Sequence, residues 1–364
     1  MKLSHVLSFS MPFALALSLT GCPEPPPETE EGDPSLLDAP PAGEGAQLET
    51  PEVEVGPGDE IQNCYFFKVS DLAKAGGLDA TKPLNLHRVQ IAQRDGSHHM
   101  NVFRVRSVVG LDPAKGTVEN KNGMGECFKS PNWADWPLIA NSQQDGQLDW
   151  EFPAGVANVL DPDEWLMVQS HYVNATTQKS PDAGKVRINF WHLPDDDVVH
   201  QMGTIFATKQ SIRVCQSNPE PAYSGSCQFN SPDPVTIIGA NGHFHSRGKQ
   251  FDMYKWDGVS IDTPPESDRF YRSEAWDDPP MLVSPDLNLQ VPANGGVFYT
   301  CNYRWNQPDP AVGCSGLDEF DKTKYGTTDD NLDCCYTFGP IVEKNEHCNI
   351  FVYYYPKQDD VNCF

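Results

Sequence analysis

Short runs of alternating, β-branched or aromatic residues dominate the chain after residue 60, and helical periodicity is scarce there. Runs of this kind that are bounded by turn residues are typical of β-strands. We expect strands at 63–69, 101–108, 165–173, 185–191, 235–238, 296–303 and 348–355, and one short helical turn at 70–75. The turn signals between them are Asp95-Gly96, Asp145-Gly146, Asn241-Gly242, Asp257-Gly258 and Asn294-Gly295-Gly296. This pattern predicts an all-β protein built from sandwiches or jelly rolls.

The 364 residues suit about two domains of ordinary size. An acidic triplet at 195–197 follows an expected strand and precedes a new apolar run, so we place a boundary there. The prediction is two tandem β-sandwich domains, 61–196 and 197–364. The triplet is equally compatible with a solvated loop inside one domain.

Charge is distributed unevenly along the chain. It carries 51 acidic and 26 basic residues, a net charge of −25, and the 38% of hydrophobic residues exclude disorder throughout. Binding to a nucleic-acid backbone is also disfavoured, since that needs clustered Lys and Arg. Residues 23–60 hold 12 acidic groups, no basic group and 9 prolines, which predicts a disordered tether.

The first 22 residues have the pattern of a secretory signal: Lys2, then an apolar run, then Leu19-Thr20-Gly21-Cys22. This end resembles the bacterial lipobox, so we expect Cys22 to be lipidated and to become the mature N-terminus. The expected location is the outer membrane, the periplasm or the cell surface, with membrane contact through the lipid anchor only. Plain secretion with a chance cysteine is the alternative.

Six of the ten histidines stand apart as candidate metal ligands. They are His98, His99, His171, His243, His245 and His347. Imidazole is a usual ligand for copper and zinc. His243 and His245 would project from the same face of a strand, whereas His98 and His99 can share an ion only if their strand bulges or ends. Spacing alone leaves open copper or zinc, and one site or two. The isolated His87, His192 and His200 are expected to be structural.

Four segments carry a resemblance to a known family, and they occur in the family's order. They are Ser97-His98-His99-Met100-Asn-Val-Phe103, Gln169-Ser-His171-Tyr172, His243-Phe-His245-Ser-Arg-Gly248-Lys249, and 345–356 with its Tyr-Tyr-Pro run. Over about residues 60–363 the chain resembles the copper type II, ascorbate-dependent monooxygenases, the family of peptidylglycine α-hydroxylating and dopamine β-monooxygenases.

The resemblance implies two jelly-roll domains that face each other across a solvent-filled cleft, with two copper ions per chain. His98, His99 and His171 would hold the electron-transferring copper. His243, His245 and a third ligand near the chain end would hold the catalytic copper, where dioxygen meets the substrate. Ascorbate or a similar one-electron donor would be the reductant. Gln169 matches a cleft-facing family position, which would give it a part in electron transfer, although a strand hydrogen bond explains it equally well.

The chain departs from the family at two positions. His347 stands where the family has a Met ligand, and imidazole favours Cu(II) more than a thioether does. Asn241 stands where the peptide-hydroxylating enzyme has an Arg that holds the substrate carboxylate, and Phe351 replaces an assisting Tyr, although Asn349 is retained. We therefore expect Asn241 and Asn349 to line a site for an unidentified small organic molecule or peptide.

After export, the ten cysteines beyond Cys22 are expected to form up to five disulfides. The resemblance implies bridges Cys64–Cys127, Cys227–Cys363 and Cys301–Cys348. The pairing of the remaining four stays open: Cys215, Cys314, Cys334 and Cys335.

Three functions remain in competition. The first is an anchored copper monooxygenase that hydroxylates a C–H bond. The second is a non-enzymatic lipoprotein that binds or delivers copper. The third is an enzyme with a three-histidine metal site that uses another metal or oxidant, such as peroxide, or a hydrolytic zinc site.

Overall fold

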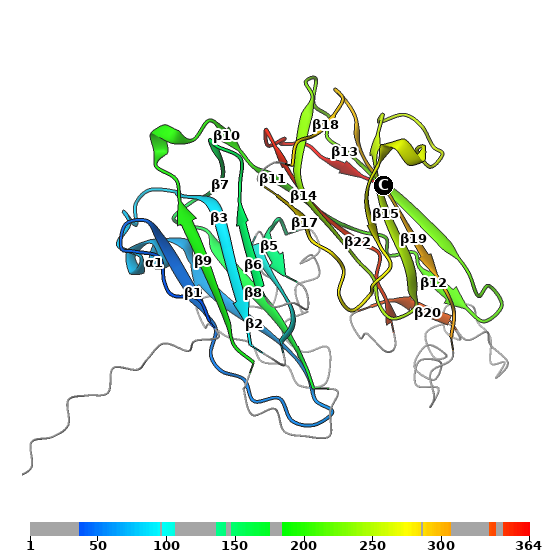
Figure 1. Cartoon of the computed structure of the whole chain (residues 1–364), viewed down its shortest axis with the longest axis horizontal. Coiled ribbons are helices and arrows are strands. Elements are labelled where there is room, and N and C mark those ends of the chain that lie inside the picture. The colour runs from blue at the N-terminus through cyan, green and yellow to red at the C-terminus, as the bar shows by residue number, and fades with distance from the viewer. Residues whose placement is uncertain are drawn as a thin grey trace, which may run out of the picture. The chain divides into compact units, whose positions relative to one another are not determined.

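Strands are the dominant secondary structure of the residues that the structure describes, which confirms the predicted all-β class (Figure 1). The computed structural model describes residues 36–94, 97–105, 136–142, 147–174, 184–284, 287–306, 335–339 and 345–364. Within these ranges there is one α-helix, α1 (Val69–Ala75), and there are short 3-10 turns at Asp195–Asp197 and Glu266–Asp268. Helix α1 covers the predicted helical turn.

Two sheets contain the strands that precede residue 202. The larger has the order β1 (Gly45–Glu49), β9 (Val186–His192), β3 (Leu84–Gln93), β7 (Val156–Leu160) and β10 (His200–Gln201), with β6 (Gln147–Glu151) also paired to β3. The smaller has the order β2 (Glu60–Lys68), β8 (Trp165–Val173), β4 (Ser97–Arg104) and β5 (Leu138–Ser142). We call these the N-terminal sheets.

The remaining strands form three C-terminal sheets. The first has the order β11 (Gly203–Thr208), β22 (Asn349–Tyr355), β14 (Val235–His243) and β17 (Leu282–Val283), with β18 (Leu289–Val291) also on β14. The second has the order β16 (Arg269–Ser273), β15 (Gly248–Trp256), β19 (Gly296–Tyr303), β13 (Ala222–Gln228) and β23 (Asn362–Cys363). The third is small: β12 (Arg213–Cys215), β20 (Cys335–Phe338) and β21 (Asn345–Glu346).

The predicted domain boundary lies close to a change of sheet. Strand β10 still pairs with β7, and the next strand, β11, pairs with β22, so the change falls between Gln201 and Gly203. The chain from Ser35 to Phe364 nevertheless forms one compact unit. The two jelly-roll domains, 61–196 and 197–364, therefore stay a prediction.

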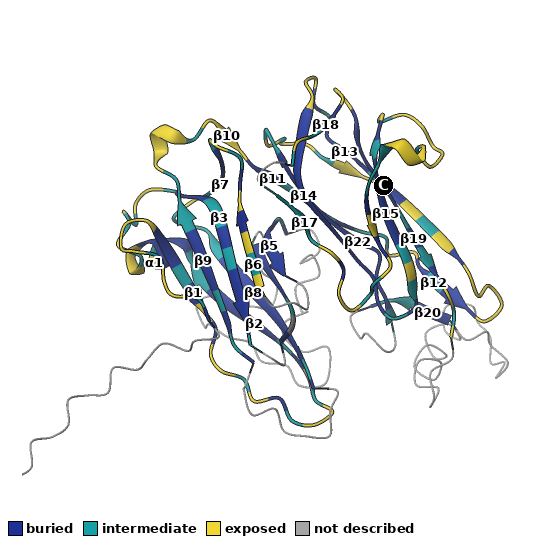
Figure 2. Cartoon of the chain, in the orientation of Figure 1, coloured by how far each residue is buried: buried dark blue, intermediate teal, exposed yellow. Residues whose placement is uncertain are grey.

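The inner strands of these sheets are the most buried part of the fold (Figure 2). All nine residues of β14 are buried, and seven consecutive residues of β8 are buried as well. Strands covered on both faces are expected to lack a clean polar alternation. These two strands carry two of the candidate ligands, His243 and His171, so part of the site lies on the best-packed strands.

Side chains of the N-terminal and C-terminal sheets also pack against each other. The ring centroids of Phe103 and Phe206 lie 5.8 Å apart, and those of Trp150 and Tyr353 lie 4.8 Å apart. One hydrophobic cluster accordingly includes residues from both sets of sheets.

Two sequence predictions require correction here. The tether predicted over 23–60 is ordered in its later part: β1 pairs with β9, and Val55 is fully buried. In β1 the buried Ala46 and Leu48 alternate with less buried residues, as in a strand. The acidic, Pro-rich composition of the whole segment led us to predict disorder instead. The turn predicted at Asn241-Gly242 lies inside β14 instead. Gly242 is needed there because a Cβ would lie only 2.5 Å from the Phe251 ring.

Candidate metal centre

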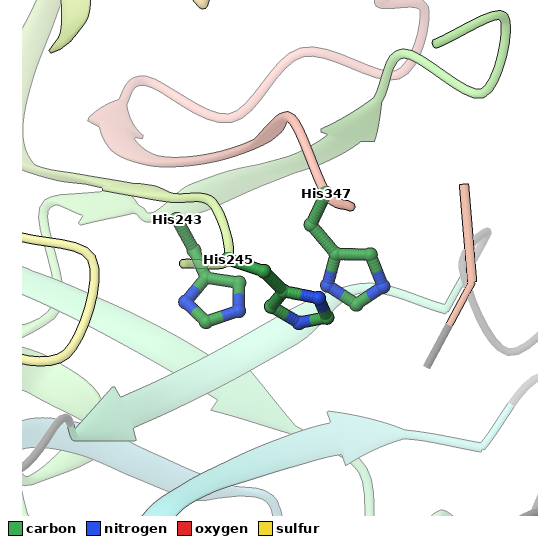
Figure 3. A group of neighbouring side chains, drawn as sticks. All are labelled: His243, His245 and His347. Carbon is green, nitrogen blue, oxygen red and sulfur yellow. The ribbon is translucent and has the colours of Figure 1, made fainter. Parts of the chain in front are cut away.

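The first two ligands lie at the end of β14. His243 is the last residue of the strand, Phe244 packs into the hydrophobic core, and His245 follows with its ring near that of His243 (Figure 3). Gly248 permits this arrangement, since a Cβ there would lie 1.9 Å from the Phe244 ring. The sequence His-Phe-His thus anchors its central aromatic residue and presents both imidazoles to one point.

The third ligand, His347, directly follows β21 and precedes Cys348. The Tyr303 hydroxyl donates a hydrogen bond of 2.6 Å to the carbonyl oxygen of His347. The Cys301–Cys348 disulfide ties the next residue to β19. These two anchors fix the backbone of His347 at the site.

The three histidines form the predicted cluster. One ring nitrogen from each of His243, His245 and His347 lies within 4.8 Å of the other two. Ligands of one ion at metal–nitrogen bonds near 2 Å lie roughly 3–4 Å apart, so the separation of these nitrogens is close to that of a shared ion's ligands. The exposed fractions of the three residues are 7%, 2% and 8%, which makes this a buried site.

The electrostatics keep the His245 and His347 imidazoles neutral. Burial lowers the pKa of His347 to about 3, and burial together with the neighbouring His347 and His243 holds the pKa of His245 well below its usual value. The Nδ1 of His245 donates to the carbonyl oxygen of Asn345 at 3.0 Å, because a carbonyl can only accept. Its Nε2 lone pair therefore remains for a metal, the usual arrangement around a metal-bound histidine.

The other predicted ligands come from β4 and β8. His99 lies directly opposite His171 in the antiparallel ladder, and their ring centroids are 4.7 Å apart. The register shifts between Ser97 and His99, so the bulge that two adjacent histidine ligands require is present at His98. The His98 side chain lies outside the described part of the structure.

The two predicted groups of ligands meet. The ring of His99 lies 5.6 Å from that of His243, edge to face. Beside them, Nδ2 of Asn141 on β5 donates to Oδ1 of Asn241 on β14 at 3.2 Å. The resemblance implies a solvent-filled cleft between the two sites, whereas side chains are in contact at this point. The reason is that buried amides and aromatic residues join the two facing sheets beside the histidines.

The predicted substrate-binding residues and the predicted electron-transfer residue Gln169 are all buried. Gln169 accepts a hydrogen bond of 3.3 Å from Nδ2 of Asn101, in agreement with a strand hydrogen bond. Asn241 uses both ends of its amide within the protein, since its Nδ2 also donates to the Pro280 carbonyl oxygen at 3.2 Å. Asn349 pairs with His243 across the ladder, and its Oδ1 is buried without a hydrogen-bond partner among the described residues.

The disulfides agree with the predicted pairs. Cys301–Cys348 and Cys227–Cys363 are confirmed, and Cys215 pairs with Cys335, which the sequence left open. Cys64 is disulfide-bonded, while its predicted partner Cys127 lies outside the described residues, as do Cys314 and Cys334. Disulfides of this number are typical of a protein that folds in an oxidising compartment.

Sequence reasoning missed the charged pair beside the ligands. Arg247 and Glu346 are both buried and lie 3.4 Å apart. Burial raises the pKa of Glu346 to about 7, while Arg247 and nearby backbone N–H groups act in the opposite direction. Each motif carries a charged residue close to a ligand, but the sequence does not show that the two charged residues pair with each other. The isolated His87 and His192 make hydrogen bonds with neighbouring backbone, as expected of structural residues.

No model of a known protein family matches the chain, and no curated protein matches its sequence. The class that fold and site define is therefore an all-β, disulfide-bonded protein with a buried three-histidine cluster suited to a metal ion.

Proposed function

We propose that this protein is a copper-dependent monooxygenase that hydroxylates a C–H bond of a small organic or peptide substrate. The observation that carries the proposal is the convergence of His243, His245 and His347, with the His99 ring 5.6 Å from His243. The family resemblance of the same motifs supports it. One oxygen atom enters the C–H bond, the other leaves as water, and a donor such as ascorbate supplies electrons singly.

The residues present fit copper. Three buried imidazoles are strong donors for it, and the His245 ring is oriented by a carbonyl oxygen on its other nitrogen. His243, His245 and His347 would hold one ion, and His98, His99 and His171 the other. Bound copper would supply the one-electron and dioxygen chemistry that side chains lack.

The chain's own residues would orient the substrate and exclude water. The His243, His245 and His347 ligands are buried, and electrostatic interactions are stronger away from solvent. Asn241 offers no cation, and both ends of its amide are engaged by Asn141 and Pro280. A carboxylate-terminated peptide would therefore find no clamp at this position, which favours a neutral substrate that hydrogen-bonds to Asn349.

The location follows from the same proposal. Disulfides indicate an oxidising compartment. We propose that Cys22, which lies outside the described residues, carries a lipid that anchors the protein to a bacterial membrane. No helix within the described ranges has the length and apolar character needed to span a membrane.

Metal content and oxygen uptake test the proposal. The purified chain is loaded with copper, the metal is counted per chain, and oxygen consumption is followed with ascorbate and a panel of small neutral compounds. Two copper ions with substrate-dependent oxygen uptake are expected. Copper binding without turnover would refute the enzyme proposal and indicate a copper-carrying protein. A single zinc ion or dependence on peroxide would indicate a different metal enzyme.

A further inference from the structure

A buried carboxylate lies directly between the two segments that carry the ligands. Glu346 is fully buried on β21, next to His347, and its Oε1 lies 3.4 Å from Nη1 of Arg247. The Arg247 guanidinium in turn lies over the Tyr336 ring, 3.5 Å from its centroid. The carboxylate is therefore enclosed by protein groups and cannot reach solvent.

The Glu346 carboxylate also binds the backbone of the segment after β14. Its Oε2 accepts a hydrogen bond of 3.1 Å from the N–H of His245, and its Oε1 accepts one of 3.0 Å from the N–H of Arg247. In the reverse direction, His245 donates from Nδ1 to the Asn345 carbonyl oxygen at 3.0 Å. These contacts join the segment of His245 to the segment of His347.

Burial of such a charge is unfavourable unless it is paired and hydrogen-bonded. Glu346 meets that condition with two backbone donors and one guanidinium, and hydrogen bonds to a charged group are stronger than neutral ones. Loss of the negative charge would therefore loosen both segments at once. The ring contact of 4.1 Å between His245 and His347 depends on those segments.

We propose that Glu346 is a positioning residue that fixes His245 and His347 relative to each other and so preforms the metal site. The inference rests on the proposed metal centre and adds a residue to it that binds no metal itself. Outer groups that orient ligands typically contribute about 10–100-fold in metal affinity. Because its ligands are already ordered, such a site binds its ion without a further loss of conformational entropy in the ligands.

The test compares Glu346→Gln with a matched control, Asp252→Asn. Asp252 is also a buried carboxylate, 2% exposed, and it accepts a hydrogen bond of 2.6 Å from Nε of Arg272 in the second C-terminal sheet. Both variants remove a buried charge next to an arginine, but only Glu346 holds the backbone of a ligand. Cu(II) affinity is measured by competition with a chelator, and the EPR spectrum reports the ligand geometry.

We expect Glu346→Gln to weaken Cu(II) binding by about 10–100-fold and to change the EPR spectrum, with Asp252→Asn unchanged in both. Wild-type affinity and spectrum in Glu346→Gln would overturn the inference while leaving the proposed function intact. If the wild-type chain binds no copper, the proposed metal centre itself is refuted. If Glu346→Gln does not fold, Glu346→Asp keeps the charge with a shorter reach, and an unchanged affinity and spectrum there would equally overturn the inference.

Discussion

The contact between the two sets of sheets can be tested at Tyr353. Its buried hydroxyl donates a hydrogen bond of 2.6 Å to Oδ1 of Asn141, and Asn141 donates in turn to Asn241 at 3.2 Å. Burial raises the pKa of Tyr353 far above its ordinary value, so the hydroxyl remains a donor at any working pH. This chain of hydrogen bonds joins β22, β5 and β14 beside the His99–His243 contact.

Tyr353→Phe removes the hydroxyl without leaving a large cavity. The variant deletes one hydrogen bond and deprives the buried Asn141 oxygen of this donor, which predicts a loss of about 1–3 kcal/mol in the free energy of unfolding. Urea denaturation followed by tryptophan fluorescence measures that loss. In a double-mutant cycle with Asn141→Ala, the coupling energy should be about 0.5–3 kcal/mol.

The control for this prediction is Tyr336→Phe. The Tyr336 hydroxyl is buried and has no hydrogen-bond partner within the described ranges, so its removal should leave stability unchanged or slightly higher. If Tyr353→Phe destabilises the protein no more than this control, the hydrogen bond from Tyr353 does not join the sheets. The hydrogen bonds from Tyr353 through Asn141 to Asn241 would then not stabilise the contact between the two sets of sheets.

Three further outcomes are expected. His347→Met should keep a metal site but weaken Cu(II) binding and favour Cu(I), because a thioether is the softer donor; an unchanged EPR spectrum would count against a ligand role. Replacing Cys301 and Cys348 by Ser should lower the free energy of unfolding by about 2–5 kcal/mol, measured by urea denaturation, and an unchanged midpoint would contradict it. Arg88 lowers the pKa of Asp149, so this half-exposed pair contributes stability at neutral pH that is lost as pH falls through the lowered pKa. Asp149→Asn should therefore cost under about 1 kcal/mol at pH 7 and nothing in strong acid, where thermal melts of the two proteins should coincide.

Local pattern was enough to predict many of the strands. The runs expected at 165–173 and 296–303 coincide with β8 and β19, because both combine aromatic and β-branched residues between clear turn signals. The pattern was misleading at Asn241-Gly242, where a frequent turn pair lies within a strand. There the deciding hydrogen bond comes from Asn141, which is a hundred positions away in sequence.

In the candidate site, too, some ligand positions follow from local sequence spacing and others from contacts between distant segments. The spacing of His243 and His245 fixes their shared face, since alternate residues of an extended segment point to the same side. The place of His347 depends instead on strand register, which sets His243 opposite Asn349 and so brings the end of the preceding segment beside His245. Only the family resemblance predicted that third member. Neither spacing nor resemblance predicted Glu346, because its role depends on backbone N–H groups about a hundred positions away, which carry no residue-specific signal.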